Sequence, residues 1–398
     1  MNIEKNVTKD IFYVGGSDRR ISLFENLYPV PDGMSYNAYV IVDEKTALID
    51  AVDQSIGKQF VQNVVNVLGG RQLDFLVVNH MEPDHSATIA DIIAIFPNVS
   101  LVMNAKTKIM FDNFFVGAKA NIVLVKENDE LSLGQHVLTF VMAPMVHWPE
   151  VMVTYDKTAK VLFSADAFGC FGALDGNICA EAYDIEGKYL SECRRYYSNI
   201  VGKYGAAVQM LLKKLANVDI QFICPLHGGV LTTAIEFFLE KYAKWSKYES
   251  ESDGVLIVYS SIYGNTENAA NLIASKLADK NIKDIRVFDA SKTDVSYLVG
   301  ETFRCKNIIV ASPTYNANIF PKVKEFLDAI CEKGIQNRNF AIVQNGSWAP
   351  VCAKLIKDIL DKQKNIEVQE EILTIVSTLK ESQSQEVDNF VDIFASKI

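Results

Sequence analysis

The placement of histidine is the feature that most constrains the fold of this chain. Four of its five histidines fall in three short motifs, NHMEPDHSATI, APMVHWPEVM and CPLHGG, and an aspartate in LFSADAFG lies between the last two. Each motif follows an apolar run, so the ends of several segments must meet at one place. Only His136 lies outside the pattern. The candidate ligands are as many as a site for two metal ions needs: His80, Glu82, Asp84, His85, His147, Asp166 and His227.

The second ligand position of the first motif decides which metal is expected. A His-x-His-x-Asp-His string is rich in nitrogen and suits zinc and hydrolysis. In this chain Glu82 stands where the second histidine of that string would be. If Asp166 bridges the metals, each could have a pair of histidines, a terminal carboxylate and the shared carboxylate. This harder, mixed ligand set can support iron in both its ferrous and its ferric state.

The spacing of the first motif fits this arrangement. A predicted strand over Phe75–Val78 is followed by an extended loop on which His80, Glu82 and Asp84 alternate. Asp84 and His85 then open a predicted helix, whose first turn can present both side chains to the second metal.

Composition indicates an ordinary globular enzyme. The chain has 398 residues, of which 49% are hydrophobic and 22% charged, enough for two or three domains with cores of their own. A net charge of −10 argues against nucleic acid as a partner. The amino-terminal segment MNIEKNVTKDIFYVGG has no apolar signal region, and no apolar run reaches the length of a membrane span. A cytoplasmic protein is therefore expected.

The chain is expected to divide near residue 250. The segment KWSKYESESDG, at Lys244–Gly254, is polar and charged and ends in glycine, which is typical of a linker. We therefore predict one domain at residues 1–250 and a second at residues 254–398. In the first, short strands alternate with turn signals, which predicts packed sheets flanked by helices. The predicted strands are Ala38–Asp43, Thr46–Asp50, Phe75–Val78, Val137–Val141, Val151–Tyr155 and Val161–Phe163.

The second domain shows a regular alternation of strand and helix patterns. This alternation predicts a doubly wound, parallel sheet of five strands. The predicted strands are Val255–Tyr259, Ile285–Asp289, Asn307–Ser312, Asn339–Gln344 and Ile366–Leu373. The predicted helices are Thr266–Lys280, Pro321–Lys333 and Ala349–Lys364, with a further helix at the carboxyl end.

Three loops of the second domain predict a mononucleotide site. The first, YSSIYGNTENAA, is rich in hydroxyl groups and glycine and runs into a helix, so it can bind a phosphate without a lysine. The other two, SPTYNANIFP and QNGSWAP, each place an aromatic residue where a flat ring would lie, at the carboxyl ends of strands. The candidate residues are Ser260, Ser261, Ile262, Tyr263, Gly264, Asn265, Thr266, Ser312, Pro313, Thr314, Tyr315, Asn316, Ala317, Asn345, Gly346, Ser347 and Trp348.

With these motifs in this order, the chain resembles a flavodiiron protein (an A-type flavoprotein). The resemblance covers essentially the whole chain, and the HxExDH string is its most specific part. It implies a metallo-β-lactamase-like αββα sandwich with a diiron site, followed by a flavodoxin-like domain that binds FMN. The short form of the family, with no fused rubredoxin or flavin reductase domain, is expected.

The resemblance also implies roles for the ligands. His80, Glu82 and His147 would hold the iron nearer the flavin. Asp84, His85 and His227 would hold the other iron, and Asp166 would bridge the two. Beyond these ligands no further catalytic residue is expected; Tyr196 or Tyr197 could donate a proton, but packing is the favoured role of both.

The reaction implied by the resemblance is reduction of O2 to water, of NO to N2O, or of both. The protein would position and shield the centres, while the redox chemistry belongs to the cofactors. The expected electron donor is external, such as rubredoxin or a reduced deazaflavin. A head-to-tail homodimer or a dimer of dimers is implied, in which the FMN of one chain faces the diiron site of the other.

Two other readings of the same sequence make different predictions. A dinuclear hydrolase with a flavodoxin-like accessory domain would carry zinc, and Glu82 argues against it. A pure electron carrier would bind FMN and use its first domain only as a scaffold, and the full set of candidate ligands argues against that.

Overall fold

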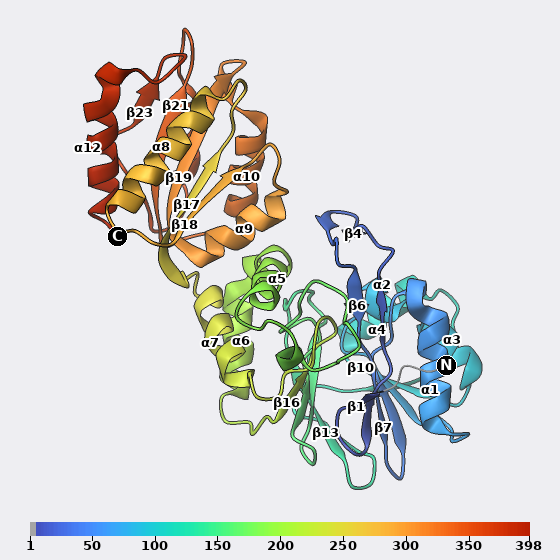
Figure 1. The fold of residues 1–398 in the computed structure, drawn as a ribbon. Helices are drawn as coiled ribbons and strands as arrows, with labels where there is room; N and C mark the ends of the chain where they lie inside the picture. Colours follow the sequence, from blue (N-terminus) through green and yellow to red (C-terminus); the bar gives the residue numbers. More distant parts are fainter. Residues whose placement is uncertain (1–4) are drawn as a thin grey trace. The chain divides into compact units, whose positions relative to one another are not determined.

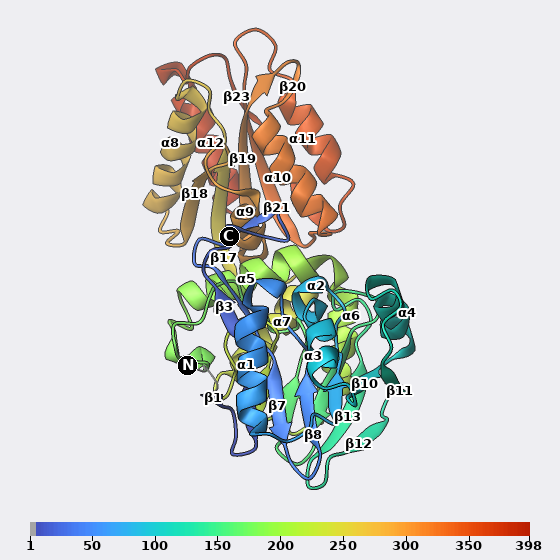
Figure 2. The same ribbon diagram turned by 90° about the vertical axis from the view of Figure 1, so that its right-hand side faces the viewer.

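The computed structural model describes residues 5–398, and contacts within the chain divide it into two units, Met1–Ala243 and Lys244–Ile398. The first unit contains two sheets packed face to face, with helices on both outer faces (Figures 1 and 2). This is the αββα sandwich that was predicted, while the exact domain limits at residues 250 and 254 stay a prediction.

The two sheets of the first unit are built largely from short strands. The strands of the larger sheet, in spatial order, are β1 (Lys5–Asn6), β2 (Ile11–Tyr13), β7 (Tyr39–Val42), β8 (Thr46–Ile49), β9 (Phe75–Val77), β10 (Ser100–Met103) and β11 (Asn121–Leu124). Those of the smaller sheet are β12 (Glu130–Ser132), β13 (Val137–Met142), β14 (Met152–Asp156), β15 (Val161–Phe163) and β16 (Phe222–Cys224). There are also two separate two-stranded sheets. One pairs β3 (Gly16–Asp18) with β6 (Met34–Tyr36), and the other pairs β4 (Leu23–Phe24) with β5 (Tyr28–Pro29).

The core between the sheets explains why these strands pair as they do. Buried side chains of the larger sheet, such as Tyr39 and Ile49, belong to the same apolar cluster as Phe140 and Phe163 of the smaller sheet. Because alternate side chains of a strand point to opposite faces, this common core fixes the register of both sheets. All six strands predicted for this part are present, with ends that differ by no more than one residue.

The helices of the first unit lie on the outer faces of the two sheets. In Figure 1, α1 and α3 lie beyond the larger sheet, and α6 and α7 lie on the opposite side of the sandwich. The helices are α1 (Gly57–Leu68), α2 (Pro83–Ser86), α3 (Ile89–Ile95), α4 (Ala105–Phe114), α5 (Lys188–Tyr196), α6 (Gly205–Leu215) and α7 (Ile235–Ser246). Single turns of other helix types occur at η1 (Gln54–Ile56), η2 (Ala180–Ala182), η3 (Tyr197–Val201) and η4 (Gly202–Tyr204).

The second unit is a doubly wound sheet. Its main path runs β18 (Ile285–Asp289), β17 (Ser252–Tyr259), β19 (Cys305–Tyr315), β21 (Arg338–Asn345) and β22 (Ile366–Val368), all parallel. Numbered along the chain this order is 2-1-3-4-5, the flavodoxin-like order, whose switch point lies between the first and third strands. Short strands β20 (Asn318–Ile319) and β23 (Leu373–Ile375) are added to β19 and β21.

The helices of this unit are α8 (Asn265–Asp279), α9 (Val295–Arg304), α10 (Pro321–Glu332), α11 (Cys352–Leu360) and α12 (Ser384–Ala395), with a single turn η5 (Glu381–Gln383). Helix α9 was not predicted, although a signal was present: the carboxylate of Asp294 accepts a hydrogen bond from the backbone N–H of Ser296 and caps the helix.

The prediction of one last strand over Ile366–Leu373 was wrong. Strands β22 and β23 both pair with β21, but the segment between them leaves the sheet. There the buried Gln369 donates its backbone N–H to the carbonyl of Phe340 (2.8 Å), and its side chain donates to the carbonyl of Phe390 (3.3 Å). Two exposed glutamates follow it, which favours a turn at the surface over a continuous strand.

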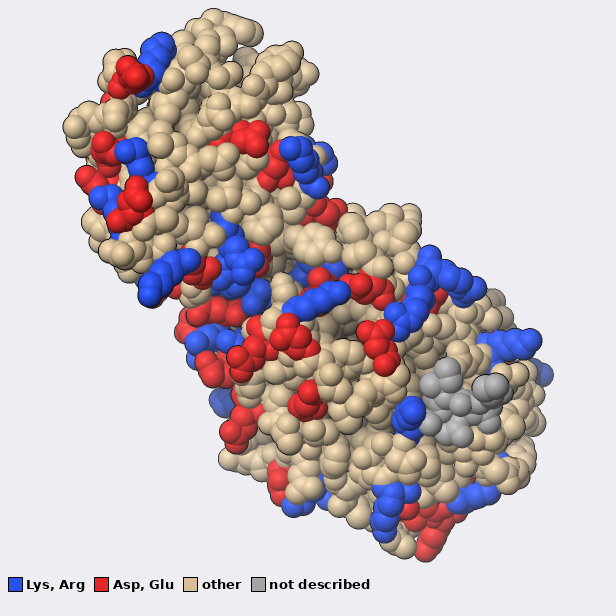
Figure 3. All heavy atoms as spheres, in the orientation of Figure 1, with Lys and Arg blue, Asp and Glu red and all other residues tan. Residues whose placement is uncertain are grey.

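None of the helices within the described residues 5–398 combines the length and the apolar character needed to cross a membrane. On the face drawn in Figure 3, acidic and basic side chains of the described residues lie close to one another on both units.

The one histidine outside the ligand pattern has a structural role. His136 is buried, and its Nδ1 lies 2.6 Å from Oδ2 of Asp156, which is fully buried. This hydrogen bond, together with the charge of Asp156, raises the pKa of His136 above its usual value. The pair therefore joins the loop before β13 to the end of β14 through a charged hydrogen bond.

This pair predicts a pH dependence of stability. Because the folded-state pKa of His136 is raised, its stabilising contribution is present below the unfolded pKa of about 6.5 and is lost as the pH rises through the folded value. Asp156→Asn should lower the free energy of unfolding at pH 6 by about 1.5–3 kcal/mol, and by less at higher pH. Urea unfolding of both proteins across this range measures the difference; an equal loss at every pH would contradict the prediction.

Candidate metal centre

The candidate ligands lie just beyond the carboxyl ends of strands in the first unit. Strand β9 leads into the loop with His80 and Glu82, β15 is followed by Asp166, and β16 by His227. His147 lies on the connection between β13 and β14. Since β9 belongs to one sheet and β15 and β16 to the other, the site lies at one edge of the sandwich, between its sheets.

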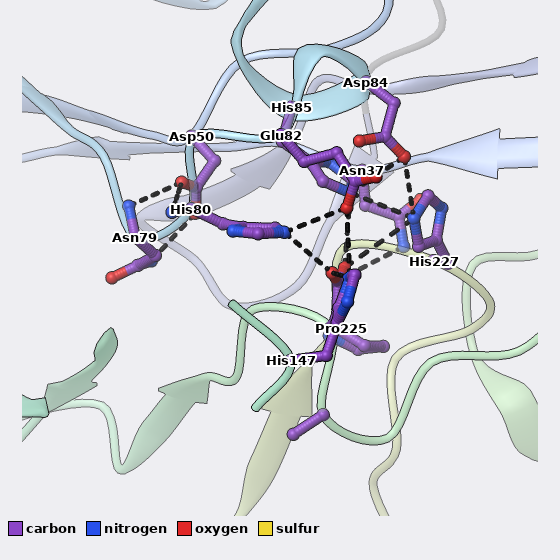
Figure 4. A network of polar contacts seen from close by, with 12 residues as sticks. Asn37, Asp50, Asn79, His80, Glu82, Asp84, His85, His147, Pro225 and His227 are labelled. Carbon is purple, nitrogen blue, oxygen red and sulfur yellow. Dashed lines mark hydrogen bonds and ion pairs between the residues drawn. The ribbon is translucent and has the colours of Figure 1, made fainter. Parts of the chain in front are cut away.

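The first motif folds as its sequence predicts. Glu82 precedes helix α2, Pro83 occupies its first turn and Asp84 follows, so the helix begins where the fixed φ of proline favours it. Helix α2 is only four residues long, and it directs Asp84 and His85 toward the other candidate ligands (Figure 4).

Four of the ligands form a first cluster, whose ligand atoms lie within 4.8 Å of one another. Oε2 of Glu82 is 3.2 Å from Nε2 of His80 and 3.0 Å from Nε2 of His147. Oδ2 of Asp166 is 3.1 Å from each of the same two nitrogens. Two imidazoles and two carboxylates thus converge on one point, although they come from three separate loops.

The other three ligands form a second cluster beside the first. Oδ2 of Asp84 is 3.3 Å from Nε2 of His85 and 3.2 Å from Nε2 of His227. The second carboxylate oxygen of Asp166, Oδ1, lies 3.3 Å from His85 Nε2 and 3.7 Å from His227 Nε2. Asp166 therefore has one oxygen toward each cluster, which is the geometry that a bridging carboxylate requires.

The donor set fits a pair of metal ions. The two Nε2 atoms of His85 and His227 approach to 2.9 Å. Both lie within 3.3 Å of Oδ2 of Asp84, yet neither oxygen of Asp84 accepts a well-aligned hydrogen bond from the described residues. Oδ1 of Asp166 is likewise buried and accepts no well-aligned hydrogen bond from them. Buried carboxylate oxygens and imidazole nitrogens that converge in this way are stabilised by a cation placed between them.

The pKa values of these groups reflect their mutual contacts. Burial by itself would raise the pKa of Asp166, but His80 and His85 hold it well below the usual value. Burial would lower the pKa of His147, yet hydrogen bonds to Asp166 and Glu82 raise it to about 9. The carboxylates thus stay ionised, and the imidazoles bind a proton strongly. A metal cation can replace such protons at a site of this kind.

The loop that carries His227 is held in place by hydrogen bonds between side chains and backbone carbonyls. Nδ1 of His227 lies 2.7 Å from the carbonyl of Ser35, and the side chain of Asn37 donates to the carbonyls of Pro225 and Gly228 (2.9 and 2.8 Å; Figure 4). Gly228 has a φ of +80°, and a Cβ there would lie 2.6 Å from Cβ of Cys170. The glycine that follows the histidine in CPLHGG is therefore required by the turn.

Several side chains around the clusters were not predicted from the sequence. The carboxylate of Glu150 lies 2.8 Å from Nδ1 of His80, and Asp50 accepts hydrogen bonds from the backbone and side chain of Asn79 (2.7 and 2.8 Å). A signal for Glu150 did exist, since it is the one acidic residue in the apolar motif APMVHWPEVM. For Asp50 no local signal separates it from an ordinary turn residue.

A further acidic residue, Glu25, lies at the turn of the β4–β5 hairpin. Glu25 is exposed on one side, but desolvation by its neighbours and the nearby carboxylate of Glu82 raise its pKa to about 7. The preceding ring, Phe24, packs edge-on against the imidazole of His227 at 5.2 Å between centroids. The hairpin is thus a neighbour of both clusters.

Of the two tyrosines considered as proton donors, Tyr196 is the one that lies at the site. Its ring centroid is 5.5 Å from that of His227, and its buried hydroxyl has no hydrogen-bond partner among the described residues. Burial and the carboxylates of Asp166, Asp84 and Glu82 raise its pKa well above the usual value. Tyr197 instead packs edge-on against Tyr242, in the core.

The second unit contains a separate cavity of about 460 Å³ at the carboxyl ends of β17, β19 and β21. Fourteen of the seventeen predicted mononucleotide residues line it, and Ala349 and Ser377 line it in addition. The three that do not are Ser260, Gly264 and Ser312. Their roles as ligand-binding residues have no support from the cavity.

These exceptions have structural reasons. The hydroxyl of Ser312 is buried and bonds the neighbouring backbone, whereas Ser260 is buried beside Ser291. Gly264 precedes α8 with a φ of +90°, a conformation that glycine adopts without strain. It therefore shapes the turn that presents Asn265 and Thr266 at the start of the helix.

The rim of this cavity is aromatic and open. Tyr263 and Trp348 are 92% and 91% exposed, and Tyr315 is 44% exposed. Flat, exposed rings provide stacking surfaces for an aromatic ligand. The neighbouring helix amino-terminus provides backbone N–H donors for a phosphate on that ligand.

Comparison with known proteins places the chain among proteins of one type. The family described as "ODP family beta lactamase" matches residues 34–228. An uncharacterized protein of Methanocaldococcus jannaschii is 31% identical, over 94% of both chains. The anaerobic nitric oxide reductase flavorubredoxin of Vibrio vulnificus is 32% identical, over 86% of this chain and 70% of its own.

Solved structures show the same fold. Rubredoxin oxygen:oxidoreductase from Desulfovibrio gigas has a TM-score of 0.92 at 24% identity, over 99% of this chain and 98% of its own. The flavodiiron protein from Giardia intestinalis has a TM-score of 0.93 at 22% identity, over 99% of this chain and 96% of its own.

The position of Asp166 predicts how its loss affects metal binding. Because one of its oxygens faces each cluster, Asp166→Ala should lower the metal content at both positions and not at one alone. Metal analysis of the purified protein measures this, with Asp84→Ala, whose carboxylate faces only the second cluster, as the matched control. A variant of Asp166 that retains a full complement of metal would rule the bridging role out.

Proposed function

Because this chain belongs to the flavodiiron proteins, we propose that it is an oxidoreductase that reduces O2 to water, NO to N2O, or both, at a diiron site supplied with electrons by FMN. Such an activity protects against oxygen or nitrosative stress. The roles divide between the two predicted domains, with the diiron site in residues 1–250 and the FMN site in residues 254–398.

The observation that carries this proposal is the position of Glu82. Its carboxylate lies within 3.2 Å of both histidines of the first cluster, which supports a role for Glu82 as a metal ligand. A carboxylate there makes both halves of the site mixed nitrogen and oxygen sets, which suit iron better than the nitrogen-rich set of a zinc hydrolase. The alternative, a dinuclear metallo-hydrolase, is not favoured for this reason.

The chain's own residues would divide the work as follows. His80, Glu82 and His147 would hold one iron, and Asp84, His85 and His227 would hold the other, with Asp166 shared. When bound, the irons and the flavin supply the electron storage and gas reduction. The apolar rings of Phe24 and Phe171, which pack on each other at 5.7 Å, help to exclude water from the side of the second cluster.

For FMN, the turn before α8 would bind the phosphate. Asn265 and Thr266 open that helix, where free backbone N–H groups and the positive end of the helix dipole favour an anion. The side chain of Asn345 lies 3.4 Å from the Thr266 hydroxyl, which links this loop to the third one. Tyr315 and Trp348 would flank the isoalloxazine ring.

The proposed partners follow from the same family. The names of two relatives, a flavorubredoxin and a rubredoxin oxygen:oxidoreductase, support rubredoxin as the external donor, with a reduced deazaflavin as the other candidate. We also propose a cytoplasmic location and a head-to-tail homodimer or dimer of dimers, so that electrons pass from the FMN of one chain to the diiron site of another.

Gas electrodes test the proposed reaction directly. Chemically reduced protein, loaded with iron and FMN, should consume O2 in one cell and NO in another, and the ratio of the two rates gives the preferred substrate. The Asp166→Ala variant provides the control, because it should lose both activities while it still binds flavin. A colourless protein that carries zinc and consumes neither gas would refute the proposal.

The FMN site can be tested apart from the irons. Asn265→Ala combined with Thr266→Ala should weaken FMN binding by roughly 10-fold or more, since the loss of two donors to a phosphate costs on the order of 1.4 kcal/mol or more. Iron content should not change. Flavin absorbance and metal analysis of one preparation measure both, and retained flavin would place the phosphate elsewhere.

Mixing the two defective proteins tests transfer between chains. Chains that lack flavin and chains that carry Asp166→Ala should each be inactive, but a re-associated mixture should regain turnover if FMN and diiron site belong to different chains of a dimer. Mass measurement shows whether mixed dimers form. Mixed dimers without activity would exclude electron transfer between chains.

A further inference from the structure

Behind the imidazole of His80 stands a buried carboxylate that is not a ligand. Oε1 of Glu150 lies 2.8 Å from His80 Nδ1 and also accepts a hydrogen bond from the backbone N–H of Met81 at 3.0 Å. Glu150 is 1% exposed, and its second oxygen has no hydrogen-bond donor among the described residues. The ligand nitrogen of His80, Nε2, faces Glu82 and Asp166 on the opposite side of the ring.

The position of Glu150 is fixed from several directions. It lies on the β13–β14 connection, directly before Val151, and its own carbonyl accepts a hydrogen bond from the side chain of Asn104 at 2.6 Å. The oxygen of that same Asn104 side chain caps helix α4. On the other side, the backbone N–H of His80 approaches Asp50 at 3.4 Å. A carboxylate held so firmly can fix both the tautomer and the orientation of the ring that it contacts.

The histidines of the second cluster have no comparable partner. Nδ1 of His227 meets only the neutral carbonyl of Ser35, and Nδ1 of His85 is buried with no hydrogen-bond partner within residues 5–398. Asp50, the other buried carboxylate nearby, accepts its hydrogen bonds from Asn79 and from a backbone N–H, and none from an imidazole. The first cluster therefore has a carboxylate hydrogen-bonded behind one of its imidazoles, and the second cluster has none, although the charges of Asp50 and His85 also interact.

We infer that Glu150 is a positioning residue that makes the two metal positions inequivalent, because it holds His80 and increases the electron donation of that imidazole to the first metal only. A carboxylate that accepts the Nδ1 proton makes the imidazole a stronger base toward the metal on its other nitrogen. The stronger donor, and the added negative charge, favour the ferric over the ferrous ion. The iron in the first cluster is thus the more easily oxidised of the two.

This inference rests on the proposed diiron function, and the chain offers an internal control for it. His136 and Asp156 form a second buried imidazole–carboxylate pair, in which Asp156 also accepts backbone hydrogen bonds from Thr158 and Ala159. Neither residue belongs to the two clusters. Asp156→Asn therefore reproduces the loss of a buried carboxylate from a histidine without a change at the metal site.

The experiment compares Glu150→Gln, Glu150→Ala and Asp156→Asn in the full chain loaded with iron and FMN. Glu150→Gln keeps an oxygen that can accept from His80 but removes the charge. It should retain both irons and raise the potential of one iron, with a change of about tenfold in the ratio of ferric to ferrous affinity, or about 59 mV for a one-electron couple. A redox titration followed by electron paramagnetic resonance measures this.

Glu150→Ala also removes the hydrogen bond to the ring. It should weaken metal binding at one of the two positions by about 10–100-fold and leave the other unchanged. Competition with a chelator, with iron and separately with Co²⁺, measures the two affinities without reference to turnover. Asp156→Asn should change neither the potential nor either affinity.

The outcomes separate the inference from the function on which it rests. Unchanged potentials in Glu150→Gln, equal weakening at both positions in Glu150→Ala, or the same effects in Asp156→Asn would each overturn the role of Glu150. If the wild-type protein does not bind iron, the proposed function fails, and the Co²⁺ affinities of the same variants still decide whether Glu150 positions His80.

Discussion

The concentration of charged ligands in the interior of the first unit is the constraint on which the rest of its structure depends. The four ligand imidazoles and the carboxylate of Asp166 are at most 8% exposed, and charges removed from water in this way are costly unless they are matched. The fold meets this demand by placing opposite partners within about 3 Å of one another and by leaving inward-facing oxygens for a cation. The loops between strands, and not the strands themselves, carry the matching groups, so the sandwich serves as a rigid support for them.

The same loops carry strained backbone. Asp50, Met145, Ala165 and Phe168 have φ values of 57°, 68°, 50° and 67°, in the left-handed region that residues other than glycine rarely adopt. Each such residue costs on the order of 1–3 kcal/mol, and persists only where the surrounding structure determines it. Here the surroundings are the two-sheet core and the network of Asp50, Asn79 and Thr154, whose hydroxyl donates to the Asn79 side chain at 2.7 Å.

The sequence allowed the convergence of the candidate ligands, the strands that precede them and the fold of both units to be predicted, because those features follow local rules of spacing and periodicity. It did not reveal Glu150 or Asp50, which act on residues 70 and 29 positions away through contacts that only the tertiary fold creates. The break between β22 and β23 was missed for a similar reason, since it depends on the burial of Gln369 against α12. In the mononucleotide loops, motif membership alone could not separate Tyr315, which lines the cavity, from Ser312, whose hydroxyl stabilises the loop itself.

The two sites differ in accessibility, and this difference fits the division of labour proposed for them. At the clusters, even the most accessible carboxylates, Glu82 and Asp84, have side chains only 13% and 12% exposed, so a substrate must be small to reach them. The mononucleotide cavity instead has Tyr263 and Trp348 almost fully exposed at its rim. A protein donor or a second copy of the chain can contact such a rim, whereas it cannot enter the sandwich. In the proposed function, electrons would therefore enter at a rim that a large partner can reach, whereas a small gas would react at buried clusters whose inward-facing oxygens leave room for metal ions.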